Sequence, residues 1–153
     1  MDELTDRFVS DVEAKTLIAP HFKNEKEFCD YLELNIRSFC EEDLNVKLAA
    51  YKREFLVDSL RSERGFIGKK ADFLIASTNG QNILIECKSA KYDSLKAIGQ
   101  LLMYKRLLLK RGIVVDRMVI VCSFFCEDLG GVVTDFKLPI ELFFMDKDKC
   151  ISR

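Results

Sequence analysis

The sequence contains no tryptophan, a single histidine, two prolines and seven glycines among its 153 residues. So few prolines and glycines argue against a loop-rich chain and exclude collagen-like and low-complexity proteins. Hydrophobic residues make up 48% and charged residues 32% of the chain, which excludes intrinsic disorder. The length is typical of one domain, so we expect a single domain over residues 1–153, with a helical extension at 1–20 and a core at 24–122.

Long apolar runs are also missing. The longest mainly apolar run, Met118–Cys126, is much shorter than the roughly 20 residues that a membrane-spanning helix needs. Residues 1–6 are acidic and lack the basic start of a signal peptide. We therefore expect no membrane partner and a cytoplasmic location.

Six cysteines are present, but no two are spaced as a CxxC pair and His21 is the only histidine. A structural zinc site is therefore not favoured. We expect buried, reduced thiols that pack as small hydrophobic groups. Disulfides are the alternative if the source is a hyperthermophile.

The net charge of −1 conceals an uneven distribution. Residues 52–111 hold 13 Lys and Arg against 6 Asp and Glu, whereas residues 1–51 hold 6 against 12 and residues 112–153 hold 5 against 7. A basic middle segment between acidic ends favours a face that binds an anion, most commonly a nucleic-acid backbone.

Periodicity and turn residues predict a mixed α/β fold with the order ααβββαββ. Asn24 is a predicted helix N-cap with Glu27 at the capping-box position, and Gly112 follows the last helix turn of its segment. The expected helices are 3–18, 24–40 and 93–111, the strands are 45–58, 71–77, 82–89, 116–125 and 140–145, and the loops include 59–69 and 127–138.

Three charged residues interrupt two strands that are otherwise apolar on both faces: Asp72, Glu86 and Lys88. Burying such groups costs several kcal/mol each unless they pair or bind an ion. Glu86 and Lys88 are two apart in a strand and so project from the same face. A three-residue loop at 78–80, with Gly80 in the left-handed conformation, would bring Asp72 opposite Glu86, whereas a two-residue loop would not.

Two facing carboxylates repel each other unless a cation lies between them. Oxygen ligands with open water positions suit Mg²⁺ or Mn²⁺. Such an ion can activate a water for attack on a phosphodiester, and Lys88 beside it can stabilise the developing charge. The alternative is a purely structural Asp–Lys–Glu cluster.

Asp72, followed 14 positions later by Glu86-Cys87-Lys88, resembles the core of the PD-(D/E)xK nuclease superfamily. The segment 68–75 is similar to the family's lead into the first acidic residue, with Ala71 in place of the name-giving proline. Gln100 and Tyr104 resemble the QxxxY element of the RecB-type branch, and residues 24–28 resemble the upstream helix that carries an extra Glu.

This resemblance implies a restriction-endonuclease-like fold with a mixed sheet of four to five strands, in which the strand after helix 93–111 runs parallel to the strand of Glu86. It also implies a Mg²⁺- or Mn²⁺-dependent deoxyribonuclease. The metal ligands would be Asp72, Glu86, Glu25 and the backbone carbonyl of Cys87. Lys88 would activate the water, while Gln100 and Tyr104 would position the substrate or the lysine.

Several points stay open at the level of sequence. Glu27, Glu54 or His21 are alternatives to Glu25 as the residue that completes the site. The expected phosphate-contacting residues are Lys69, Lys70, Lys91, Lys96, Arg61 and Arg64, whereas Lys105, Arg106, Lys110 and Arg111 are expected to be plain solvent-facing charges.

The expected partner is DNA, and a homodimer would allow both strands to be cut. Two other kinds of function compete with the nuclease. One is a catalytically inactive relative that binds nucleic acid. The other is an interaction module with an exposed apolar patch formed by Cys122, Phe124, Phe125, Phe143 and Phe144.

Overall fold

The computed structural model describes residues 22–62, 65–89, 94–145 and 150–152, with the backbone alone described for 59–62, 65–67 and 150–152. The predicted helix at 3–18 and His21 lie outside the described residues. Among the described residues, no helix has the length and apolar character needed to cross a membrane.

Six strands form one mixed sheet in the order β1-β2-β3-β4-β5-β6. The first three pair antiparallel, β4 pairs parallel to both β3 and β5, and β6 pairs antiparallel to β5. The strands are β1 (Leu48–Ser62), β2 (Gly65–Ser77), β3 (Asn82–Lys88), β4 (Arg117–Cys122), β5 (Ile140–Met145) and β6 (Cys150–Ser152). The mixed α/β class, the antiparallel meander and the parallel fourth strand are thus confirmed.

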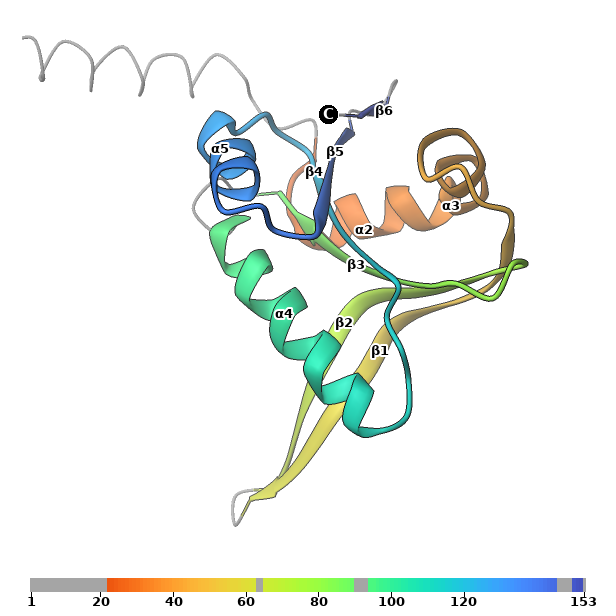
Figure 1. The fold of residues 1–153 in the computed structure, drawn as a ribbon, viewed down its shortest axis with the longest axis vertical. Coiled ribbons are helices and arrows are strands. Elements are labelled where there is room, and N and C mark those ends of the chain that lie inside the picture. The colour runs from red at the N-terminus through yellow and green to blue at the C-terminus, as the bar shows by residue number, and fades with distance from the viewer. Residues whose placement is uncertain (1–21, 63–64, 90–93, 146–149, 153) are drawn as a thin grey trace, which may run out of the picture.

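Helices cover the two faces of this sheet (Figure 1). α2 (Glu25–Leu34), α3 (Ile36–Ser38) and the π-helical turn η1 (Phe39–Asp43) lie on one side, and α4 (Ser94–Lys110) and α5 (Glu127–Asp135) on the other. Two apolar clusters result, one between the sheet and α2 and the other between the sheet and α4. The strands between them are apolar on both faces because both faces are covered.

The loop expected at 59–69 is wrong. β1 and β2 continue as a paired two-stranded arm, with Asp58 opposite Lys69 and Ser62 opposite Gly65. Figure 1 shows this arm extending beyond the helices. The sequence of this segment lacks the apolar alternation that predicts a strand, and the backbone pairing identifies it as one.

Two helical segments also differ from the expectation. The segment 24–40 is not one continuous helix, because α2 ends at Leu34 and Asn35 leaves helical geometry with φ −109°. Residues 127–135 form α5, although Gly130 and Gly131 indicated a loop. Leu129 is buried in the cluster beneath α4, and this packing outweighs the roughly 1 kcal/mol that each helical glycine costs.

Candidate active site

The turn between β2 and β3 sets the position of the acidic pair. The ladder pairs Phe73 with Ile85 and Ala76 with Asn82, and Ser77 bonds to the carbonyl of Gln81. Three residues therefore form the loop, with Gly80 in the left-handed region at φ 85°. This confirms the three-residue loop that the sequence predicted as the condition for bringing Asp72 beside Glu86.

Asp72 and Glu86 lie one position beyond Phe73 and Ile85, the end pair of the β2–β3 ladder. Their carboxylates accept backbone hydrogen bonds at this position. The Asp72 amide donates to Glu86 Oε1 at 3.2 Å, and the Cys87 amide donates to Asp72 Oδ2 at 2.8 Å. Each carboxylate thus takes a backbone N–H from the opposite strand. These bonds fix both side chains relative to the sheet rather than leaving them to rotate in solvent.

Burial and mutual repulsion disfavour two negative charges at this point. Burial raises the pKa of Asp72, opposed by the Cys87 amide and by Lys88. Burial and the neighbouring Asp72 charge raise the pKa of Glu86 to about 8. Without a cation, the pair therefore holds a proton at neutral pH. Binding of a divalent ion between the two carboxylates would release this proton to solvent.

Lys88 and Glu25 join this pair from different elements. Lys88 lies at the end of β3 and is only 6% exposed, and its charge lowers the pKa of both Asp72 and Glu86. Its Nζ lies 4.0 Å from Glu25 Oε1, at the first turn of α2. The structure thus brings four of the sequence-predicted site residues together.

The helix α4 contributes the predicted Gln100 and Tyr104. Tyr104 is buried, and its pKa is raised by this burial and by the charges of Glu86 and Asp72, while a hydrogen bond from Gln100 lowers it. Within the described part of the chain, Gln100 Oε1 is buried without a hydrogen-bond partner. The wall formed by α4 therefore presents an unsatisfied acceptor and a hydroxyl beside the acidic pair.

The alternatives to Glu25 have separate positions. Glu27 Oε2 accepts the Lys23 amide at 2.9 Å while Asn24 caps the Glu27 amide, so Glu27 acts in the cap of α2. Glu54 is exposed on β1 with φ 52°. His21 is outside the described residues. Of the carboxylates open at the level of sequence, Glu25 is the one with a described contact to Lys88.

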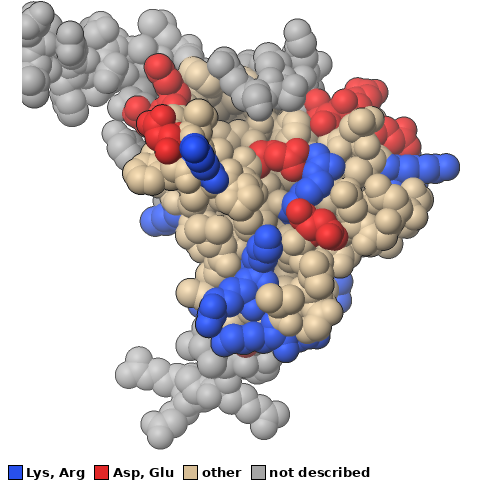
Figure 2. Space-filling view, viewed as in Figure 1, with Lys and Arg blue, Asp and Glu red and all other residues tan. Residues whose placement is uncertain are grey.

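The basic side chains predicted to contact phosphates are only partly described. Lys69 and Lys70 are exposed on β2, directly before Asp72, and Lys96 is exposed on the first turn of α4. In the view of Figure 2, blue side chains gather over the lower part of the molecule and red ones lie mainly over the upper part. Lys91 and Arg64 lie outside the described residues, and only the backbone of Arg61 is described.

Sequence reasoning missed the contacts of two arginines and one cysteine. Arg53 on β1 contacts Asp30 and Glu33 of α2, and its charge lowers the pKa of Asp72. Arg111 is not a plain surface charge, because it donates to the carbonyls of Leu56 and Val57. Residue type gave no signal for these contacts; the β1–β2 register would have placed Arg53 next to Asp72.

Cys29 is the third missed residue. The ligand atoms of Cys29, Asp72 and Cys87 lie within 4.8 Å of one another. Both thiols are buried on the α2 side of the sheet. The described cysteines 29, 40, 87, 122 and 126 are all free thiols, as the sequence predicted.

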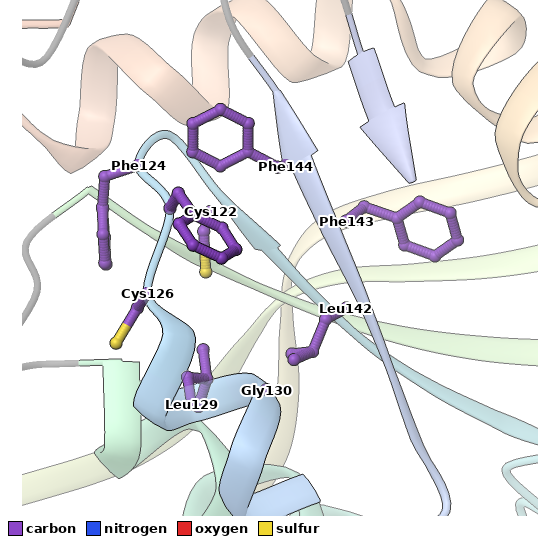
Figure 3. A pocket seen from close by; sticks show the side chains of 9 residues that line it. Cys122, Phe124, Cys126, Leu129, Gly130, Leu142, Phe143 and Phe144 are labelled. Carbon is purple, nitrogen blue, oxygen red and sulfur yellow. The ribbon is translucent and has the colours of Figure 1, made fainter. Parts of the chain in front are cut away.

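The proposed apolar patch of the interaction-module interpretation is largely covered. Cys122 and Phe143 are buried, Phe124 and Phe144 are half-buried, and Phe125 is 42% exposed. These side chains line a small apolar pocket of about 50 Å³ between β4, α5 and β5 (Figure 3). They do not form the contiguous exposed surface that such a module requires.

Comparison with known proteins gives a limited result. No model of a protein family matches the chain, and no curated protein matches it. Two solved structures are similar. A repair endonuclease from Pyrococcus abyssi shares 19% identity at a TM-score of 0.45, covering 75% of this chain and 47% of its own. An EndoMS–dsDNA2 complex shares 19% identity at a TM-score of 0.41, covering 76% and 45%. The chain thus spans about half the length of either structure.

Proposed function

We propose that this chain is a divalent-cation-dependent nuclease that hydrolyses DNA phosphodiester bonds. The observation that carries the proposal is the placement of the Asp72 and Glu86 carboxylates side by side, each fixed by a backbone N–H, with buried Lys88 on the same strand as Glu86. Burying these three charged groups together costs free energy unless they pair with one another or bind an ion.

The donor set fits a hard divalent cation. Asp72 and Glu86 offer carboxylate oxygens, the ligands that Mg²⁺ and Mn²⁺ prefer, and Glu25 is a third carboxylate near Lys88. Burial and the neighbouring Asp72 charge raise the pKa of Glu86, and a bound cation would offset the repulsion between the two carboxylates. Mg²⁺ or Mn²⁺ held by Asp72, Glu86, Glu25 and the Cys87 carbonyl would lower the pKa of a water and neutralise charge on a phosphodiester.

The surrounding side chains have distinct proposed roles. Lys88 is the cation that orients the attacking water and stabilises charge developing on the phosphate. Tyr104 and Gln100 would position the substrate or Lys88 from α4, with the Gln100 amide hydrogen-bonded to the Tyr104 hydroxyl. Glu25 limits the rotation of Lys88 by pairing with it.

DNA is the proposed substrate because of the family resemblance and of the basic residues around Asp72. Lys69, Lys70 and Lys96 are exposed, and phosphate contacts from them would position a strand without reading its bases. The further predicted contacts, Lys91, Arg61 and Arg64, belong to the same proposal.

The test is cleavage of labelled single-stranded, duplex, flap and four-way-junction DNA with Mg²⁺, Mn²⁺ or EDTA. We expect cation-dependent cutting that Asp72→Asn and Lys88→Ala each reduce by at least about 100-fold, since each removes a group that stabilises the transition state. Glu42→Gln, an exposed carboxylate on η1, is the matched control and should cut at the wild-type rate.

Two outcomes would contradict the proposal. Equal cutting by the wild type and both site variants would indicate a contaminating nuclease. Salt-sensitive DNA binding without any cutting would indicate the inactive nucleic-acid-binding relative instead.

A further inference from the structure

A second ligand cluster lies directly behind the acidic pair. Cys29 Sγ, Cys87 Sγ and an Asp72 carboxylate oxygen lie within 4.8 Å of one another. Cys29 comes from α2, Cys87 from β3 and Asp72 from β2. Three different elements therefore converge on one point, and each supplies one ligand atom.

The chemistry of this cluster differs from that of the acidic pair. Mg²⁺ and Mn²⁺ prefer oxygen ligands, whereas two sulfurs and one oxygen suit a softer ion such as Zn²⁺. Zn²⁺ is held by Cys at about 2.3 Å and by Asp at about 2.0–2.2 Å in tetrahedral sites. Ligand atoms that already lie within 4.8 Å of one another need only small side-chain adjustments to reach that geometry.

Packing and a hydrogen bond fix the positions of the three ligands. Cys29 is 5% and Cys87 0% exposed, within the cluster between α2 and the sheet. Asp72 is held by the Cys87 amide at 2.8 Å. Asp72 is half-buried. A fourth coordination position would remain for water.

We infer that Cys29, Cys87 and Asp72 form a site for a single Zn²⁺-like cation. Binding would displace the protons of both thiols, so its apparent affinity should rise with pH. Because Asp72 also belongs to the proposed catalytic pair, Zn²⁺ would compete there with Mg²⁺. That consequence rests on the proposed function, whereas the site itself does not.

The test uses Co²⁺ as a spectroscopic probe on the full, reduced chain under anaerobic conditions. We expect one equivalent of Co²⁺ to produce a thiolate-to-cobalt absorption band in the near ultraviolet, and Zn²⁺ to abolish it. An excess of Mg²⁺ should leave most of the band, since Mg²⁺ does not bind thiolates. This readout is independent of DNA cleavage.

Variants assign the band to the cluster. Cys29→Ser and Cys29→Ala should each weaken Co²⁺ binding at least tenfold, and Cys87→Ser should do the same. Asp72→Asn should weaken binding but retain the thiolate band. Cys40→Ser and Cys122→Ser replace equally buried free thiols outside the cluster and should bind as the wild type does. Circular dichroism checks folding, and if Cys87→Ser is unfolded, the two Cys29 variants decide.

Two results would overturn the inference. One is the absence of a thiolate band at any Co²⁺ concentration. The other is a band that survives in both Cys29 variants or disappears in Cys40→Ser or Cys122→Ser. Loss of DNA cleavage activity would leave these results unaffected, so failure of the nuclease proposal and failure of this one are distinguishable.

Discussion

At the scale of single residues, the ionisation of Glu86 makes the free energy of unfolding depend on pH. Its pKa is raised from an ordinary 4.5 to about 8 in the folded chain. The folded state therefore binds one more proton than the unfolded state between these two values. Its stability contribution is present below pH 4.5 and is lost as the pH rises to about 8.

We predict that metal-free wild type loses unfolding free energy over this window, by at most about 1.4 kcal/mol per pH unit. Glu86→Gln should show a flatter profile, because the amide does not ionise. Urea titrations at several pH values measure this difference. Glu42→Gln should keep the wild-type slope, and equal slopes in wild type and Glu86→Gln would contradict the assignment.

Glu25 and Glu27 of α2 should differ in role, with Glu25 acting in DNA cleavage and Glu27 in helix stability. Glu25→Gln removes a charge 4.0 Å from Lys88 and should reduce DNA cleavage about 10- to 100-fold at unchanged stability. Glu27→Ala removes the acceptor of the Lys23 amide and should cost about 0.5–1 kcal/mol of stability. Cleavage rates and melting curves of both variants decide. The reverse pattern would identify Glu27 as the site residue.

At the scale of elements, Arg111, which directly follows α4, connects this helix to β1 by hydrogen bonds. It donates to Leu56 and Val57 and its guanidinium lies 5.6 Å from the centre of the Phe55 ring. Arg111→Ala should therefore cost about 1 kcal/mol or more, because two backbone carbonyls lose a charged donor. Lys110→Ala, also exposed at the end of α4, should cost little. Chemical denaturation compares them, and equal losses would mean that the contact contributes nothing.

Elements differed in how well the sequence predicted them. The β2–β3 hairpin was predicted from local signals, an Asn-Gly turn between continuous apolar strands. Its register was predicted from the requirement that Asp72 lie opposite Glu86. The β1–β2 arm was missed because residues 59–69 lack the regular apolar alternation that predicts a strand. The helix α5 was missed because packing of Leu129 overrides the glycines at 130 and 131.

At the scale of the whole molecule, uneven charge should govern DNA binding. The basic residues concentrate between 52 and 111, and Lys69 and Lys70 are exposed beside Asp72. Replacing both with alanine should weaken binding to all sequences alike and reduce the salt slope of log K by about 2. Fluorescence anisotropy at several salt concentrations measures this. Lys47→Ala, an exposed lysine before β1, should leave the slope unchanged, and an unaltered slope in the double variant would place the DNA elsewhere.

The sequence alone determined the acidic pair and the lysine. Asp72, Glu86 and Lys88 lie within one hairpin, so a three-residue turn and the two-residue period of a strand suffice to place them together. Gln100 and Tyr104 were likewise predicted as neighbours, because they lie one helical turn apart.

Tertiary structure alone decided what surrounds that pair. Glu25 and Cys29 approach from one face of the sheet and Tyr104 from the other, and these meetings depend on how α2 and α4 pack. Spacing could not indicate the Cys29–Asp72–Cys87 cluster, since Cys29 comes from α2, which no local rule connects to the β2–β3 hairpin that carries Asp72 and Cys87. Packing of distant apolar faces, rather than any local pattern, brings them within reach.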